Sequence, residues 1–265
     1  MCYHFNMKVL ITNDDGIDFK GLRILAQVFS EIADVYVVAP EGERSSHSHH
    51  LTIKGKIRYE EREVPYAKKA YALWGTPADC VHMGLHALLN EEIDLVLSGI
   101  NRGANISTDI IYSGTISAAR EAYIYHVPAL ALSLNRGDRE NYELAARYGK
   151  AIAKEYLEQD KCRDYFLNVN VPDLDEKDIK GIMVCDKVGQ MDYGDSYTLG
   201  KEDDKDYIFI GQSNVRFLGD TSDLRIDASA LENGYVSLSA MGNDQFSYDH
   251  FDLLDEIAGK IDKSL

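Results

Sequence analysis

Cysteine is scarce in this sequence of 265 residues, and its few copies lie far apart. The four cysteines, Cys2, Cys80, Cys162 and Cys185, include no C-x-x-C pair. A structural zinc site or a redox-active dithiol needs closely spaced cysteines, so the spacing suggests neither. We expect reduced, structural thiols.

Long apolar runs and an excess of positive charge are also missing. No window approaches the roughly 18 consecutive apolar residues of a membrane helix, and residues 1–6 show no targeting pattern. We therefore expect a cytoplasmic protein with no membrane partner. The net charge of -16 argues against a nucleic-acid partner, which would reward clustered Lys and Arg. A small anion can still be captured locally by helix N-termini, backbone amides and a bound cation.

Apolar runs rich in β-branched residues alternate with segments of helical period through the first half of the chain. This alternation is typical of βαβ units and a parallel sheet. We predict an α/β fold with a Rossmann-like, doubly wound, mostly parallel sheet. The expected strands are residues 9–11, 35–39, 94–98 and 129–134, and the expected helices are 22–32, 77–90, 114–125 and 142–158.

The pattern changes beyond about residue 160, where we expect a smaller C-terminal β/α extension. The strand-like segments there are residues 166–171, 182–186, 207–210 and 235–240. A Gly- and Asp-rich stretch, 189–206, indicates a protruding hairpin or loop, and 251–261 has the apolar spacing of a docking helix. We divide one overall domain into a catalytic core, 1–135, and a remainder, 136–265, with the hairpin and an oligomerisation helix.

The acidic pair Asp14 and Asp15 directly follows the first expected strand and precedes a helix. In open α/β sheets, ligands bind at the carboxyl ends of strands. Two adjacent carboxylates repel one another unless a proton or a cation intervenes, so the pair favours a hard metal such as Mg²⁺ or Mn²⁺. A simple turn is the alternative, because Asn, Asp and Gly are turn residues.

A second loop leaves the next strand at the same edge of the sheet, and its Ser45 could approach the same cation. By composition alone this loop is a solvated turn. His47, His49 and His50 follow it, and histidine is a common zinc ligand. Because their spacing lacks a helical i, i+4 pair, we favour a solvated loop whose imidazoles touch phosphate or substrate.

The Gly-rich loop after the third expected strand offers Asn101 and Asn105 as oxygen ligands or N–H donors. Ser113, Gly114 and Thr115 then open a helix. Free N–H groups and the positive end of the helix dipole make such a start an anion site. Ordinary capping by Ser113 or Thr115 is the alternative and is compatible with phosphate binding.

Together these segments resemble the SurE survival-protein family of metal-dependent nucleotidases. The resemblance is carried by VLITNDDG (9–16), VVAP (37–40), GTPADC (75–80), SGINRGAN (98–105) and YSGT (112–115). It implies one divalent cation, Mg²⁺ or Mn²⁺, held by Asp14, Asp15, Ser45 and Asn101. It also implies hydrolysis of nucleoside 5′- or 3′-monophosphates, short polyphosphate as a further substrate, and a homodimer or homotetramer built by exchange of C-terminal elements.

One departure from the family pattern concerns the serine loop. The family usually places a glycine after the loop serine, whereas this chain has Ser46 followed by the histidines. The sequence therefore leaves open the preferred base, the phosphate position and the role of His47, His49 and His50.

The expected chemistry is metal-assisted hydrolysis of a phosphomonoester. Asp14 and Asp15 anchor the cation, and one of them, or a water, acts as the base. Asn105 and the amides near residues 113–115 stabilise charge on the phosphoryl oxygens. The general acid for the leaving oxygen is not identified by the sequence.

Two other classes of protein gather acidic residues at strand ends. A receiver-like or phosphate-binding regulatory module without turnover needs a phospho-accepting Asp after a central strand and a Lys after a later one. Here Pro40 and Asn101 follow those strands. A covalent aspartyl phosphatase needs an Asp-x-Asp spacing, which the adjacent pair lacks.

Overall fold

The computed structural model describes residues 7–212, 215–244, 254 and 257–258. The terminal helix expected over 251–261 lies, apart from three residues, outside this part and stays a prediction. Within the described residues, every helix is too short or too polar to cross a lipid bilayer.

A nine-stranded sheet forms the centre of the molecule, in the order β3-β4-β2-β1-β5-β6-β7-β13-β8. Parallel pairing joins β1 (Met7–Thr12), β2 (Ala33–Pro40), β4 (Ala67–Leu73), β5 (Leu95–Arg102), β6 (Ala129–Leu134) and β7 (Phe166–Val171). The antiparallel strands are β3 (Tyr59–Arg62), beside β4, and β13 (Val236–Met241), beside β7, and β8 (Ile182–Val184) runs parallel to β13. The chain winds outward from β1 through β2 and β4, then crosses back to β5, so the strand order reverses between β1 and β5.

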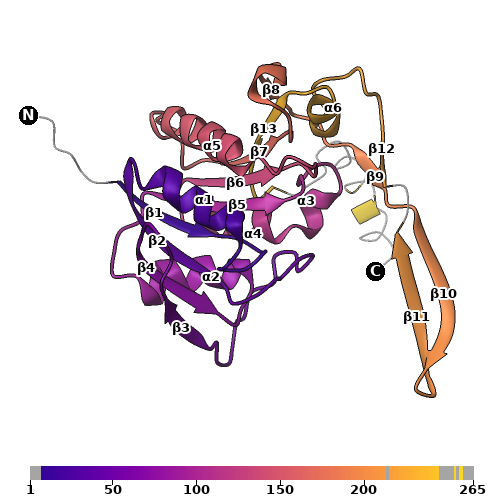
Figure 1. Ribbon diagram of the computed structural model, residues 1–265, viewed down its shortest axis with the longest axis horizontal. Coiled ribbons are helices and arrows are strands. Elements are labelled where there is room, and N and C mark those ends of the chain that lie inside the picture. The colour runs from indigo at the N-terminus through magenta and orange to yellow at the C-terminus, as the bar shows by residue number, and fades with distance from the viewer. Residues whose placement is uncertain (1–6, 213–214, 245–253, 255–256, 259–265) are drawn as a thin grey trace, which may run out of the picture.

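Helices cover both faces of this sheet, as Figure 1 shows. Helices α1 (Lys20–Phe29) and α5 (Tyr142–Leu157) pack on one face, and α2 (Pro77–Met83) and α4 (Gly114–Ile124) on the other. The alternation along β1 follows this division, because Val9 and Ile11 join one core cluster and Leu10 joins the other. The predicted doubly wound, mostly parallel α/β fold is confirmed.

The edge beyond β2 was not predicted as strands. β3, at the edge of the sheet, is largely exposed, whereas β4 is exposed only at Lys68 and Lys69, near its start. Edge strands tolerate such polar sequences because one side faces solvent. The helix expected over 77–90 also divides, because α2 passes into a π-helical turn, η1 (Gly84–Leu88), and the helix expected over 22–32 ends at Phe29.

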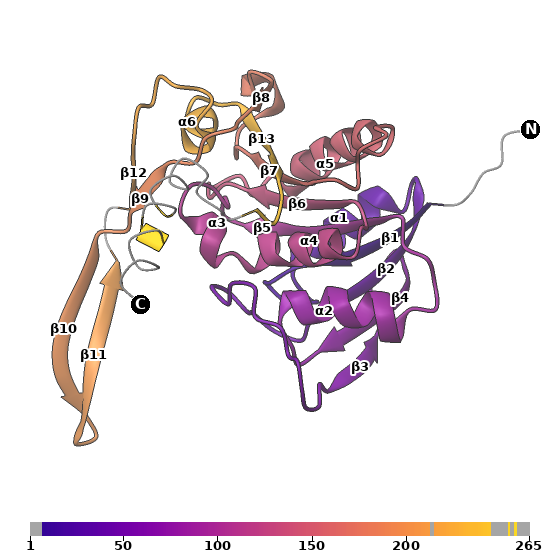
Figure 2. The same ribbon diagram turned by 180° about the vertical axis from the view of Figure 1, so that it is seen from behind.

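The C-terminal extension carries a protruding hairpin, but it covers 195–212 instead of the predicted 189–206, and the strand expected over 207–210 is part of its second arm. Figures 1 and 2 show β10 (Asp195–Glu202) and β11 (Lys205–Gln212) reaching away from the body. Asp203 and Asp204 form a two-residue turn with φ of 48° and 59°, the geometry that suits hairpin twist. The short elements are α3 (Asp109–Tyr112), η2 (Glu176–Asp178), β9 (Gln190–Asp192), β12 (Arg216–Leu218) and α6 (Asp227–Glu232).

Candidate active site

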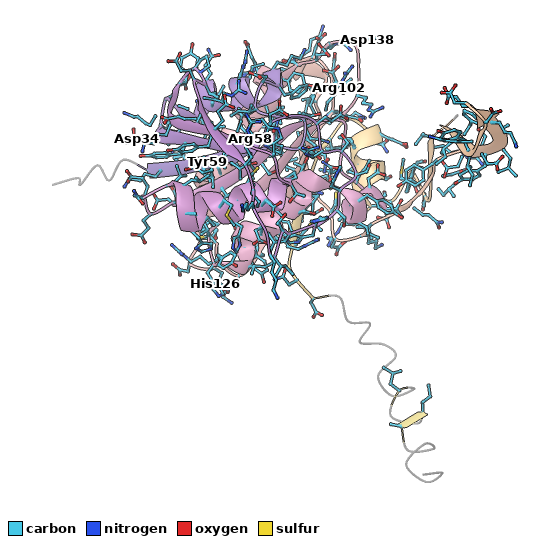
Figure 3. The ribbon with its side chains drawn as sticks, turned by 90° about the horizontal axis from the view of Figure 1, so that it is seen from below. Asp34, Arg58, Tyr59, Arg102, His126 and Asp138 are labelled. Carbon is cyan, nitrogen blue, oxygen red and sulfur yellow. The ribbon has the colours of Figure 1, made fainter. Side chains whose placement is uncertain are left out.

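The loops at the carboxyl ends of the central strands enclose a cleft of about 1050 Å³. It lies where the strand order reverses, which is the usual ligand site of open α/β sheets. Figure 3 labels Arg102, at the end of β5 beside this cleft, and Asp34, near the opposite end of the strands. Six of the predicted site residues line the cleft: Asp14, Asp15, Ser45, Asn101, Asn105 and Ser113.

Two glycines let the loop after β1 and the loop after β2 lie against each other. Gly16 has a φ of 103°, and a Cβ there would lie 3.1 Å from the Cα of Gly42, so a side chain would force the loops apart. The Asn13 side chain closes the turn by donating to the Gly16 carbonyl at 2.9 Å. The Arg44 amide donates to the Asp14 carbonyl at 2.7 Å. These contacts bring the serine loop to the acidic pair.

The acidic pair itself is held close together and partly out of water. Asp14 is 5% exposed, and its Oδ1 accepts the Thr115 hydroxyl at 2.8 Å. Burial raises the pKa of Asp14, while the Thr115 hydrogen bond opposes that rise. Burial and then the neighbouring charge of Asp14 raise the pKa of Asp15 to about 6. Both shifts indicate negative charge that a bound cation would offset.

The position of Asn101 depends on an irregularity near the end of β5. The pairing register with β6 shifts between Gly99 and Asn101. Gly99 has a φ of 145°, and a Cβ there would lie 2.2 Å from the Leu132 carbonyl oxygen, so only glycine fits. The Asn101 side-chain amide donates to the Gly103 carbonyl at 2.8 Å, which leaves its oxygen as an acceptor toward the cleft.

Ser45 is exposed at the mouth of the cleft, with a carboxylate beside it. Its hydroxyl donates to Glu43 Oε1 at 2.7 Å. Glu43 also lines the cleft and adds to the negative field at Asp14 and Asp15. Glu43 was not predicted from the sequence, although it lies two residues before the predicted serine.

Asn105 is fixed by a buried polar network. Its side-chain amide donates to the Ser133 hydroxyl at 2.9 Å, and its backbone amide donates to Asn170 Oδ1 at 2.7 Å. Its carbonyl accepts the Asn168 side-chain amide at 2.9 Å. These hydrogen bonds were not predicted from the sequence. Two asparagines inside a fully buried strand are nevertheless a recognisable signal, because buried amides need partners.

The predicted residues at the start of α4 have two different roles: Ser113 lines the cleft, whereas Gly114 and Thr115 contact Asp14. Ser113 lines the cleft and caps the helix by accepting the Ile116 amide at 3.0 Å. Thr115 is fully buried and binds Asp14, and a Cβ on Gly114 would lie 3.0 Å from the Asp14 side chain. Gly114 and Thr115 therefore help to fix the position of the Asp14 side chain. A phosphate-binding role for their amides stays a prediction.

Arg102 and Arg136 are the basic side chains that line the cleft. They come from the ends of β5 and β6, and Arg136 packs against Gly103. Across the described ranges, neither guanidinium takes part in an ion pair. Both are thus available to a bound anion. Neither was predicted as a site residue: Arg102 stands inside the SGINRGAN segment but was given no role, and Arg136 lies outside the quoted motifs.

The donors that meet in the cleft fit a hard divalent cation. They are two carboxylates, an amide oxygen and a hydroxyl, all oxygen ligands of the kind that Mg²⁺ and Mn²⁺ prefer. No group of three His, Cys, Asp or Glu side chains in the described chain is arranged to hold a metal. The predicted ligand set accordingly combines the acidic pair with Ser45 and Asn101, and it stays a prediction.

Known proteins of one family are similar to this chain. A family model described as Survival protein SurE matches residues 9–194. A 5′-nucleotidase SurE from Clostridium botulinum (strain Alaska E43 / Type E3) is 43% identical over 260 residues, covering 95% of this chain and 98% of that protein. Another, from strain ATCC 19397 / Type A, is 39% identical over 254 residues, covering 94% and 97%. A crystal structure of a SurE protein from Aquifex aeolicus superposes with a TM-score of 0.79 at 32% identity, covering 95% of this chain and 99% of that one.

Proposed function

The chain belongs to the Survival protein SurE family, and on that premise we propose that it is a divalent-metal-dependent phosphomonoesterase. Its proposed reaction is hydrolysis of nucleoside 5′- or 3′-monophosphates to nucleoside and phosphate. The observation that carries the proposal is the single cleft lined by Asp14, Asp15, Ser45 and Asn101. The relatives named 5′-nucleotidase supply the substrate class.

Asp14, Asp15, Ser45 and Asn101 would hold one Mg²⁺ or Mn²⁺. The raised pKa of Asp15, about 6, supports a cation there, because the acidic pair lacks a compensating positive charge within hydrogen-bonding distance among the described side chains. When bound, the cation would polarise a phosphoryl oxygen and lower the pKa of a water molecule.

The protein groups have separable roles in this reaction. Asp14 is deeply buried, and its Oδ1 already accepts the Thr115 hydroxyl. A carboxylate oxygen of Asp15 is therefore the better acceptor for the proton of the attacking water. Asn105 gives one amide hydrogen to Ser133 and keeps the second for a phosphoryl oxygen. Arg102 and Arg136 balance the charge of the phosphate.

Phosphate release from a substrate panel tests the reaction and its specificity. The panel contains nucleoside 5′- and 3′-monophosphates, sugar phosphates and tripolyphosphate, each with Mg²⁺, Mn²⁺ or EDTA. We expect metal-dependent release from nucleoside monophosphates. Tripolyphosphate is a further expected substrate, because two unpaired arginines line the cleft. Phosphate binding without release under any condition would instead favour a regulatory module without turnover.

We also propose a homodimer or homotetramer assembled through the C-terminal half. The hairpin projects from the body (Figure 1), and Leu199 and Ile210 on it are 80% and 72% exposed. Apolar side chains on a projecting hairpin favour burial against another copy. Light scattering on Leu199→Lys should show a smaller species than the wild type, and an unchanged mass would contradict the assignment. The cytoplasmic location expected from the sequence remains a prediction.

A further inference from the structure

A buried carboxylate outside the cleft joins the histidine-rich loop to the helix layer. Glu121 on α4 is 3% exposed, and its Oε2 lies 2.8 Å from His49 Nε2. Its Oε1 lies 2.9 Å from His82 Nδ1, on α2. Burial alone would raise the pKa of Glu121, but the two imidazole hydrogen bonds outweigh it and hold that pKa below its ordinary value. The carboxylate therefore stays ionised, and both contacts are strong ones.

The loop that ends at His49 has a backbone that needs support. Ser46 and Ser48 have φ values of 58° and 52°, in the left-handed region. Residues other than glycine are strained there, and the conformation persists only where surrounding contacts hold it. The loop therefore depends on its attachments to the body.

Those attachments bracket Ser45. On one side, the Arg44 amide donates to the Asp14 carbonyl at 2.7 Å. On the other side, the Ser48 amide donates to the Tyr112 carbonyl at 3.0 Å, and His49 is bound to Glu121. Ser45 lies between these fixed points and reaches the cleft. His49 is thus four residues along the chain from Ser45, a proposed metal ligand, and lies outside the cleft. A substitution there leaves the cleft lining itself unchanged.

We propose that Glu121, acting through His49, is a positioning residue that keeps Ser45 at the cleft. The effect on metal affinity rests on the proposed function, whereas the effect on the order of the loop does not. Glu121 and His49 touch neither the proposed cation nor the substrate, and they act only on the position of the loop.

His82 provides a matched control for this role. It binds the same carboxylate as His49 at nearly the same distance, and the two imidazoles are 25% and 22% exposed. His82 lies on α2, whose N-cap residue binds the chain just after the loop through the Thr76 hydroxyl, which donates to the His50 carbonyl at 2.6 Å. Among the described contacts, His82 itself has no hydrogen bond to residues 44–49. If Glu121 only holds α4 to its neighbours, loss of either histidine has the same consequence.

Two measurements on the full-length protein separate these roles. The first is hydrogen exchange of backbone amides 44–49 in EDTA, and the second is calorimetric titration with Mn²⁺. For His49→Ala we expect exchange about tenfold faster and Mn²⁺ affinity about tenfold weaker, as loss of one charged hydrogen bond implies. His82→Ala should leave both within about twofold. His49→Gln, whose amide can donate to Glu121, should restore most of both.

The outcomes distinguish the positioning role from the proposed function. Equal changes in His49→Ala and His82→Ala, or unchanged exchange in His49→Ala, would overturn the positioning role. If only His49→Ala speeds exchange and no variant, including the wild type, binds Mn²⁺, the positioning role stands and the proposed metal site is wrong.

Discussion

Replacing Asp15 by asparagine should stabilise the metal-free protein and remove its response to divalent cations. Asp15 is partly buried beside Asp14, and its pKa is raised to about 6 because burial and the neighbouring carboxylate disfavour its charged form. Asparagine keeps the shape and can still accept the Arg102 amide. The substitution therefore removes a repulsion in the metal-free state and one ligand in the metal-bound state.

The size and the pH dependence of this effect follow from the pKa shift. A rise from 3.8 to about 6 corresponds to roughly 3 kcal/mol at about 1.4 kcal/mol per unit, and solvent screening reduces this to ~1–2 kcal/mol. Because the folded pKa is the higher one, the wild type has its full stability below about pH 4 and loses it as the pH rises through 6. The advantage of Asp15→Asn should therefore grow from pH 4 to pH 7 and then level off.

Thermal unfolding in EDTA at several pH values, repeated with Mn²⁺, measures both effects. At pH 8 we expect Asp15→Asn to melt about 2–8 °C above the wild type in EDTA, given about 2–4 °C per kcal/mol for a chain of this size. With Mn²⁺ only the wild type should gain stability. Asp18→Asn is the control, because Asp18 lies in the same loop but its side chain is 76% exposed. An Asp15→Asn variant no more stable than the wild type at pH 8, or a difference independent of pH, would refute the reasoning.

Three further substitutions test other parts of the site. Thr115→Val keeps the shape but removes the hydroxyl that binds Asp14, and calorimetry should show Mn²⁺ affinity about tenfold weaker, in line with loss of a charged hydrogen bond. Arg136→Gln should raise the KM for a nucleoside monophosphate about tenfold in steady-state assays, at a cost typical of a charged contact, and unchanged KM would exclude a role for this side chain. Gly99→Ala places a Cβ 2.2 Å from the Leu132 oxygen at a positive φ, and chemical denaturation should show a loss of more than about 3 kcal/mol.

The central strands and the acidic pair were predictable because they obey strong local rules. A run of β-branched residues predicts a buried strand, and polar residues at the carboxyl end of that strand predict a ligand-binding site. Asp14 and Asp15 come just after β1, and Asn101 lies in the last two residues of β5, so their sequence position determined their place in the fold. The strands expected over 129–134 and 166–171 match the observed bounds.

The remaining features depend on contacts between distant segments. Glu121 lies 72 positions from His49 and 39 positions from His82 in the sequence. The residues around each of them give no sign that the three side chains meet. Arg136 reaches the cleft only because β6 lies beside β5. The edge strand β3 and the start of its neighbour β4 escaped prediction because their exposed, charged side chains lack the apolar alternation that marks a core strand.

The most direct test of the proposed reaction is phosphate release from a nucleoside 5′-monophosphate by metal-stripped protein, with and without added Mn²⁺, for the wild type and Asp14→Asn. We expect release only by the wild type and only with the cation. The variant should lose at least about a hundredfold, as expected when an electrostatic contact to the reacting group is removed. Equal release in EDTA, or full activity of Asp14→Asn, would contradict it.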